Sequence, residues 1–141
     1  MRHTVLFVED SKVNIRFVEM AFQALKLQNV NLEIRENLED AIEYVRANRE
    51  DILILFTDLE YPGVSSQGLS GLSLIDYCRQ SRVNFPICVV SSYLSKNVKQ
   101  TCIEKGASLF IEKPFVIEKF KDILERVIEV ENVRSYSCDV R

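Results

Sequence analysis

The chain has no tryptophan, a single histidine and only four cysteines, and these shortages exclude several kinds of site. The cysteines stand at positions 78, 88, 102 and 138, so none of them forms a C-x-x-C pair. Together with the isolated His3, this spacing argues against a zinc site or a redox dithiol. Cys78, Cys88 and Cys102 lie within apolar patterns, so we expect small core residues of a reducing compartment, the cytoplasm.

Long hydrophobic runs and an excess of one charge are also missing. The first apolar run, Val5–Val8, ends at Glu9 and is too short for a signal peptide, and no run approaches the length of a membrane span. The 18 basic and 21 acidic residues leave a net charge of -3, which gives no general attraction to nucleic acid or to an anionic membrane. We therefore expect no nucleic-acid partner and no membrane partner.

The composition that remains is typical of one soluble domain. Of the 141 residues, 47% are apolar and 28% are charged, which excludes a disordered or collagenous chain. A chain of this length buries roughly two thirds of its unfolded surface, so its core does not need disulfides. We expect residues 1–132 to form the domain, and residues 133–141, which lack periodicity, to be a short frayed C-terminal tail with no output domain.

Five short apolar runs predict strands. Two of them, Ile52–Phe56 and Ile87–Val90, are apolar on both faces, as is typical of parallel strands covered by helices on each side. Val30–Ile34 alternates between apolar and polar residues, which favours an edge strand. The other two candidates are Thr4–Val8 and Leu109–Ile111.

Helical patterns separate these strands. Apolar residues recur at helical spacing after Ser11 and after Asn37, which are candidate N-caps. Further helices are expected around Leu72–Arg79 and Val98–Ile103, and a fifth shows one clear stripe over Val116–Ile128. Five alternating βα units predict an α/β fold, a doubly wound five-stranded parallel sheet with five helices and right-handed crossovers.

Polar side chains follow four of the five strands, at the edge of the sheet where such folds bind ligands. These side chains belong to Glu9, Asp10, Asp58, Ser91, Ser92 and Lys113. If the first and third strands are neighbours, the three carboxylates converge, and two of them about 4 Å apart repel by about 4 kcal/mol at an effective dielectric of 20. Such a cluster needs a cation.

Hard oxygen ligands without histidine or cysteine favour Mg²⁺, with Mn²⁺ or Ca²⁺ as substitutes. A metal ion and an ammonium group beside a carboxylate suit phosphoryl transfer, because they neutralise the oxygens of the group in transfer. A carboxylate can also be the nucleophile itself, which gives an aspartyl phosphate.

Each of these residues has a simpler explanation when taken alone. An acidic pair at the start of a helix stabilises the helix dipole, and an aspartate before a Pro/Gly loop is often a turn residue. Lys113 before Pro114 suits an exposed loop, and Ser91 and Ser92 can cap the helix near Ser95. Their joint placement at strand ends favours the phosphoryl site.

The same residues resemble the receiver domain of two-component response regulators, from about Thr4 to Val130. Four motifs carry the resemblance in order: Val8–Asn14 resembles the acidic pair, Thr57–Pro62 the phosphoacceptor motif, Val90–Ser92 the hydroxyl switch strand and Gly106–Phe115 the final signature. The resemblance implies a flavodoxin-like, CheY-like fold with strand order 2-1-3-4-5.

The resemblance also implies a phosphoacceptor and a metal site. Asp58 would accept the phosphoryl group. Mg²⁺ would be held by Glu9, Asp10 and Asp58, with the backbone carbonyl of Glu60 as a further ligand.

Five residues stand at further positions that the family uses. Lys113 and Ser91 would contact the phosphoryl oxygens, and Phe110 would be a switch aromatic whose ring turns inward as Ser91 moves. Glu60 and Tyr93 lie where the family tunes hydrolysis, and we expect Tyr93 to shield the phosphoaspartate.

One departure from the family lies beside the acceptor. Pro62 and Gly71 are nine positions apart (71 − 62), a longer span than the family usually has, so residues 63–70 form a Gly/Ser-rich insertion. The insertion would contact a partner, shield the acyl phosphate from water or only form a loop, since surface insertions change stability little.

These implications predict a single-domain response regulator. It would receive phosphoryl groups from a histidine kinase or phosphotransfer protein, signal by binding a downstream protein and catalyse only its own phosphorylation and dephosphorylation. A phosphorelay intermediate or phosphate sink is an alternative. The breadth of the fifth helical stripe permits a homodimer through the face formed by the fourth helix, fifth strand and fifth helix.

Other classes fit the sequence less well. A degenerate receiver, acting as a phosphorylation-independent binding module, typically lacks an acidic residue or the lysine, and both are present here. A phosphatase with an aspartyl nucleophile needs a second aspartate where Glu60 stands. A flavodoxin-like cofactor binder needs a Gly-rich phosphate loop after the first strand, which the sequence lacks.

Overall fold

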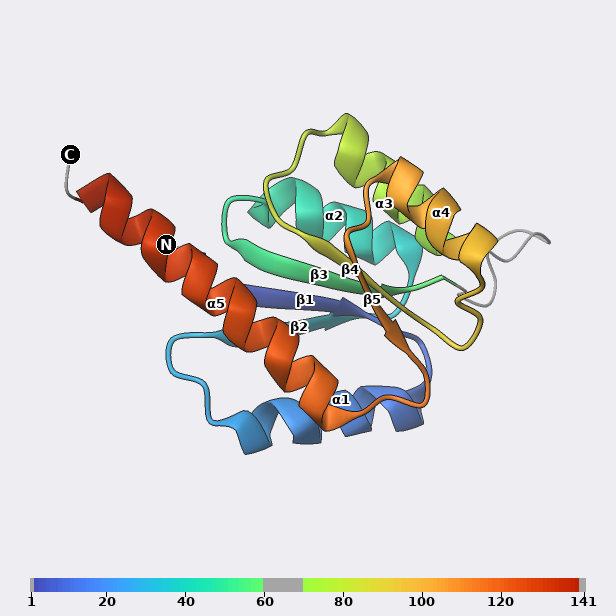
Figure 1. Ribbon diagram of the computed structural model, residues 1–141, viewed down its shortest axis with the longest axis horizontal. Helices are drawn as coiled ribbons and strands as arrows, with labels where there is room; N and C mark the ends of the chain where they lie inside the picture. The colour runs from blue at the N-terminus through green and yellow to red at the C-terminus, as the bar shows by residue number, and fades with distance from the viewer. Residues whose placement is uncertain (1, 60–69, 140–141) are drawn as a thin grey trace.

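The computed structural model describes residues 2–59 and 70–139, and these residues form five strands and five helices in alternation (Figure 1). The strands are β1 (Thr4–Val8), β2 (Asn31–Arg35), β3 (Ile52–Asp58), β4 (Ile87–Ser91) and β5 (Leu109–Glu112). The helices are α1 (Lys12–Leu25), α2 (Leu38–Asn48), α3 (Ser70–Gln80), α4 (Lys96–Lys105) and α5 (Ile117–Asp139). Every predicted strand and helix is present, with bounds that differ by a few residues except at the end of α5.

The strands form one parallel sheet in the order β2-β1-β3-β4-β5, which confirms the predicted topology. Strand β3 lies between β1 and β4, and its register pairs Thr57 with Val8 on one side and Asp58 with Val90 on the other. On the next strand, Ser91 of β4 pairs with Glu112 of β5. The last residues of β1, β3, β4 and β5 therefore lie at one edge of the sheet.

Helices cover both faces of the sheet (Figure 1). Helices α1 and α5 pack on one face and α2, α3 and α4 on the other, each layer with its own apolar core. All seven residues of β3 and all five of β4 are buried, whereas β2 at the edge is only partly covered. This explains why the central strands are apolar on both faces and the edge strand alternates.

Side chains at helix ends satisfy backbone groups as the sequence predicts. Ser11 caps α1 by accepting a hydrogen bond from the Asn14 N–H, and Asn37 caps α2 in the same way. The cap of α4 is Ser95, whose Oγ accepts from the Val98 N–H at 3.2 Å. Because Ser95 has this role, the simpler explanation of Ser91 as a helix cap is wrong, and Ser91 is the last residue of β4.

Helix α5 is longer than expected, because it continues to Asp139. The expectation of a frayed tail over residues 133–141 is therefore wrong for residues 133–139. In the turn of α5 that follows Ile128, the inward-facing position is filled by Glu131 rather than by an apolar residue, so the apolar pattern of the sequence stops before the helix does. Glu131 is 8% exposed, and its Oε2 accepts a hydrogen bond of 2.7 Å from the Arg2 backbone N–H, which ties α5 to the first residues of the chain.

Three cysteines are small core residues, as predicted. Cys78, Cys88 and Cys102 are free thiols with 0% exposure, while the side chain of Cys138 lies outside the described residues. Burial raises the pKa of Cys78 and Cys88 to about 12, which keeps both thiols protonated at neutral pH. No helix in the described part of the chain has the length and apolar character needed to cross a membrane.

The end of β3 is held in place by a close approach of α3. The Gly71 N–H donates to the Leu59 carbonyl at 3.0 Å. A Cβ atom on Gly71 would lie 2.2 Å from the Asp58 carbonyl oxygen and 2.6 Å from the Leu59 Cα, both of them backbone atoms. Only glycine therefore allows α3 to pack this close to the residue predicted to accept the phosphoryl group.

We predict that Gly71→Ala lowers the free energy of unfolding by about 1–3 kcal/mol, because the added methyl group forces two backbone segments apart. Chemical denaturation followed by far-UV circular dichroism measures the change. The matched control is Ser73→Ala at an exposed position of the same helix, which should leave stability nearly unchanged. Equal stabilities of the two variants would contradict the close contact.

Candidate phosphoryl and metal site

Three carboxylates converge where β1 and β3 end. Glu9 and Asp10 follow β1, and Asp58 is the last residue of β3. One oxygen from each lies within 4.8 Å of the others. Glu9 is 2% exposed, Asp58 is 9% exposed and Asp10 is partly buried. The adjacency of the first and third strands thus brings together the residues that the sequence analysis selected.

Glu9 is the most firmly held of the three. Its Oε2 accepts from the backbone N–H groups of Asp10 at 3.1 Å and Ser11 at 3.2 Å, and its Oε1 accepts from Asn14 Nδ2 at 3.3 Å. Lys113 Nζ lies 3.1 Å from the same Oε1. Four donors therefore compensate a carboxylate that would otherwise be very unfavourable to bury.

Asn14 is a site residue that the sequence analysis did not single out. It lies within the first predicted motif, but no role followed from its residue type. Its position in the sequence could have indicated this role. Asn14 lies in the first turn of α1, five residues after Glu9, so its side-chain amide can donate a hydrogen bond to the Glu9 carboxylate.

Lys113 joins the two strand ends. Its Nζ lies 2.8 Å from Asp58 Oδ2, and its side chain is 19% exposed. Burial would lower the pKa of Lys113, but hydrogen bonds and charges from Asp58 and Glu9 outweigh burial, so the pKa is raised above its ordinary value. The ammonium group is therefore charged at neutral pH, and the exposed-loop explanation of Lys113 is wrong.

The Asp58 carboxylate uses both of its oxygens. Oδ1 accepts from the Leu59 backbone N–H at 2.7 Å, and Oδ2 accepts from Lys113. The Asp58 side chain retains 12% exposure, so it can be reached from solvent. This orientation fixes the carboxylate at the open edge of the sheet.

The cluster fits a hard divalent cation. Its ligands are carboxylate oxygens alone, which Mg²⁺ and Mn²⁺ prefer over the nitrogen and sulfur ligands typical of zinc sites. Three carboxylates against one ammonium group leave an excess of negative charge that a divalent ion balances. Glu60, predicted to add a backbone carbonyl, lies outside the described residues, as do residues 63–69 of the insertion.

Ser91 lies beside the cluster at the end of β4. Its carbonyl accepts from the Lys113 backbone N–H at 2.9 Å, and its Oγ accepts from the Tyr93 backbone N–H at 3.2 Å. Ser91 is 6% exposed, whereas Tyr93 is 74% exposed. Ser91 is thus buried at the end of β4, while the tyrosine side chain is largely in solvent.

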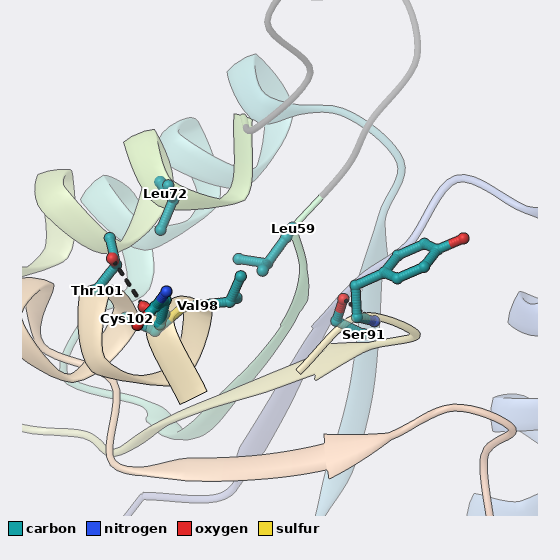
Figure 2. A pocket seen from close by; sticks show the side chains of 8 residues that line it. Leu59, Leu72, Ser91, Val98, Thr101 and Cys102 are labelled. Carbon is teal, nitrogen blue, oxygen red and sulfur yellow. Dashed lines mark hydrogen bonds between the residues drawn. The ribbon is translucent and has the colours of Figure 1, made fainter. Parts of the chain in front are cut away.

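An apolar pocket of about 280 Å³ opens next to Ser91, between the end of β3, α3 and α4. Figure 2 shows Leu59, Leu72, Val98 and Cys102 around it, with Ser91 at one side. The hydroxyl of Thr101 at its rim donates to the Asn97 carbonyl at 3.0 Å, within α4. The pocket offers space for an apolar side chain close to Ser91.

Phe110, the predicted switch aromatic, lies on the same face of the sheet. It pairs with Val89 across β4 and β5, is partly buried, and packs against the core beneath α2, α3 and α4. The Nζ of Lys99 on α4 lies 5.9 Å from the centre of its ring. Phe110 is therefore placed on the sheet beneath α4.

Comparisons with known proteins agree with this fold and site. The chain matches the family described as response regulator receiver domain over residues 5–125. It is 24% identical over 135 residues to the two-component response regulator ARR6 of Arabidopsis thaliana, covering 92% of this chain and 71% of that protein. It is 30% identical over 115 residues to a cyclic di-GMP phosphodiesterase of Thermotoga maritima, covering 82% of this chain but 28% of that protein.

Two solved structures share the fold. The chemotaxis protein CheY4 of Vibrio cholerae has a TM-score of 0.73 and 23% identity, covering 90% of this chain and 99% of that one. The receiver domain of the Francisella response regulator 1452 has a TM-score of 0.77 and 18% identity, covering 92% of this chain and 99% of that one. Because the family match spans residues 5–125, the chain belongs to the response regulator receiver domain family of two-component signalling.

Proposed function

We propose that this chain is a phosphorylation-controlled switch that accepts a phosphoryl group on Asp58 in a Mg²⁺-dependent reaction. The observation that carries the proposal is the contact of Asp58 Oδ2 with Lys113 Nζ at 2.8 Å, beside two further carboxylates at the open edge of the sheet. A partly exposed carboxylate can attack a phosphorus atom. A cation fixed beside it then neutralises negative charge on the oxygens of the resulting acyl phosphate.

The donor is a phosphohistidine of a histidine kinase or phosphotransfer protein. An oxygen of Asp58 forms a bond to phosphorus as the bond from phosphorus to the imidazole nitrogen breaks, and the imidazole is the leaving group. Hydrolysis of the acyl phosphate restores the Asp58 carboxylate and releases phosphate. The Lys113 side chain stays beside Asp58 in the unphosphorylated and the phosphorylated protein, and it contacts the phosphoryl oxygens after transfer.

Glu9, Asp10, Asp58 and the backbone carbonyl of Glu60 are the residues that would hold Mg²⁺ or Mn²⁺. When bound, such an ion would neutralise charge on the phosphoryl oxygens during transfer. Glu9 would supply a negative charge to the ion. Its carboxylate is also held in a fixed orientation, because both of its oxygens accept hydrogen bonds.

The switch consists of Ser91 and Phe110. After phosphorylation the Ser91 hydroxyl donates to a phosphoryl oxygen, and the Phe110 ring turns inward on the face that also holds the apolar pocket. That movement changes the surface formed by α4, β5 and α5, because Phe110 lies on β5 and its ring centre is 5.9 Å from the Nζ of Lys99 on α4. A local change in charge thereby becomes a change in the affinity for another protein.

The output is the binding of a downstream protein in the cytoplasm. The chain acts as a single-domain regulator and catalyses only its own phosphorylation and dephosphorylation. A phosphorelay intermediate or phosphate sink uses the same acceptor without the output surface. A homodimer through the α4–β5–α5 face remains a prediction of the same proposal.

We predict that acetyl phosphate adds one phosphoryl group to the protein, as read by intact mass, only when Mg²⁺ is present. Asp58→Asn should abolish the gain, because the amide is not a nucleophile of comparable strength. The matched control is Asp51→Asn, the same chemical change at an exposed turn before β3, which should be phosphorylated normally.

Two outcomes would contradict the proposal. Phosphorylation of Asp58→Asn to the same extent would place the acceptor elsewhere. A wild-type protein that gains no mass, and whose melting temperature Mg²⁺ does not raise, would be a phosphorylation-independent binding module, since binding of the ion to the folded state must stabilise it.

We predict that Tyr93→Ala shortens the lifetime of the phosphorylated protein about threefold, a change of about 0.7 kcal/mol in the barrier to hydrolysis. The physical reason is that the ring, two residues after Ser91, limits the approach of water to the acyl phosphate. Decay of the phosphorylated mass with time measures the lifetime. Tyr93→Phe keeps the ring and should behave as the wild type, and an unchanged lifetime in Tyr93→Ala would contradict the shielding role.

A further inference from the structure

A second open site lies at the opposite end of the sheet from Asp58. A groove of about 500 Å³ runs between the C-terminal half of α5 and the segments that lead into β4 and β5. The strands begin at this end of the sheet, away from the β5–α5 connection (Figure 1). The groove shares no lining residue with the phosphoryl site, so the two sites are separate.

Three arginines from two distant parts of the chain line this groove. Arg2 precedes β1, and Arg126 and Arg134 stand two turns apart on α5. Among the residues that the structure describes, neither the Arg2 nor the Arg126 guanidinium has a carboxylate within salt-bridge distance. Arg134 Nη1 lies 3.9 Å from Glu131 Oε1 and keeps 54% exposure.

The charge of the groove suits a dianion. The one acidic residue among its described lining residues is Glu131, whose carboxylate is 8% exposed and already accepts from the Arg2 backbone N–H at 2.7 Å. Three guanidinium groups against one carboxylate leave two positive charges (3 − 1). A phosphate monoester carries a charge of about −1.5 to −2 at pH 7, and arginine binds its oxygens in pairs.

The floor of the groove is apolar. Leu53, Phe85, Pro86 and Val127 line it, and Val130 is 60% exposed on its α5 side. Leu53 and Phe85 are only 3% and 5% exposed, so a ligand gains the free energy of burying apolar surface mainly by covering Pro86, Val127 and Val130, in addition to its contacts with arginine. The volume is within the range of pockets that hold small molecules.

We propose that this groove binds a small phosphorylated ligand with a planar apolar ring, the chemistry of a nucleoside monophosphate. The phosphate lies among Arg2, Arg126 and Arg134, and the ring covers the floor near Phe85 and Val130. A ligand bound there contacts both α5 and the segments that precede the strands.

The test is a titration of the ¹⁵N-labelled protein with adenosine monophosphate in the absence of Mg²⁺, followed by amide chemical shifts. We expect saturating shifts at Gly106, Ser108 and Val130, with a dissociation constant below about 1 mM. The amides of Glu9 and Lys113 at the phosphoryl site should stay unchanged. Adenosine, which lacks the phosphate, and pyrophosphate, which lacks the ring, should each bind at least about tenfold more weakly.

Two variants locate the site. Arg126→Gln should raise the dissociation constant about tenfold or more, and Lys121→Gln, the same change at an exposed position of α5 outside the groove, should leave it unchanged. Val130→Asp places a negative charge at an exposed position of the groove and should abolish binding without affecting folding. Shifts that do not saturate by about 10 mM, or equal affinity in Arg126→Gln, would overturn the site, and pyrophosphate binding as tight as that of the nucleotide would overturn the role of the ring.

Discussion

The ammonium group of Lys113, buried between the carboxylates of Asp58 and Glu9, is the interaction on which the carboxyl end of the sheet depends. Asp10 stands in the same cluster, and each close pair of carboxylates repels by about 4 kcal/mol at 4 Å and an effective dielectric of 20. Lys113 offsets one unit of that charge, and its backbone N–H holds the end of β4 through Ser91. The negative charge that remains is the reason why a divalent cation, and then an anionic phosphoryl group beside the ammonium, would suit this site.

The parallel sheet brings these groups together from distant parts of the chain. Lys113 is 104 residues from Glu9 and 55 from Asp58, yet the order β2-β1-β3-β4-β5 places the ends of their strands at one edge. The buried central strands provide a rigid base, and the contact at Gly71 fixes the last residue of β3. The two ends of the sheet consequently differ in chemistry, with acidic groups where the strands end and an arginine-lined groove where they begin.

Much of this arrangement could be predicted from the sequence, because it rests on local patterns. Apolar runs predicted the strands, and the polar residues that follow them predicted the carboxylate cluster with Lys113. The end of α5 was missed because Glu131 fills an inward position that the apolar pattern expects a hydrophobic residue to occupy. Contacts between side chains that are distant in the sequence, or that depend on side-chain conformation, could not be predicted either. Examples are the hydrogen bond from Asn14 to Glu9 and the three arginines that line the groove.

The most direct test of the central claim is to identify the residue that carries the phosphoryl group. Borohydride reduces an aspartyl phosphate to homoserine, so the protein treated with acetyl phosphate and Mg²⁺ can be reduced, digested and mapped by peptide mass spectrometry. The account predicts homoserine at position 58 in the sample with Mg²⁺ and intact aspartate there in the sample without it. Homoserine at position 10, or reduction at neither carboxylate in a protein that has gained phosphoryl mass, would contradict it.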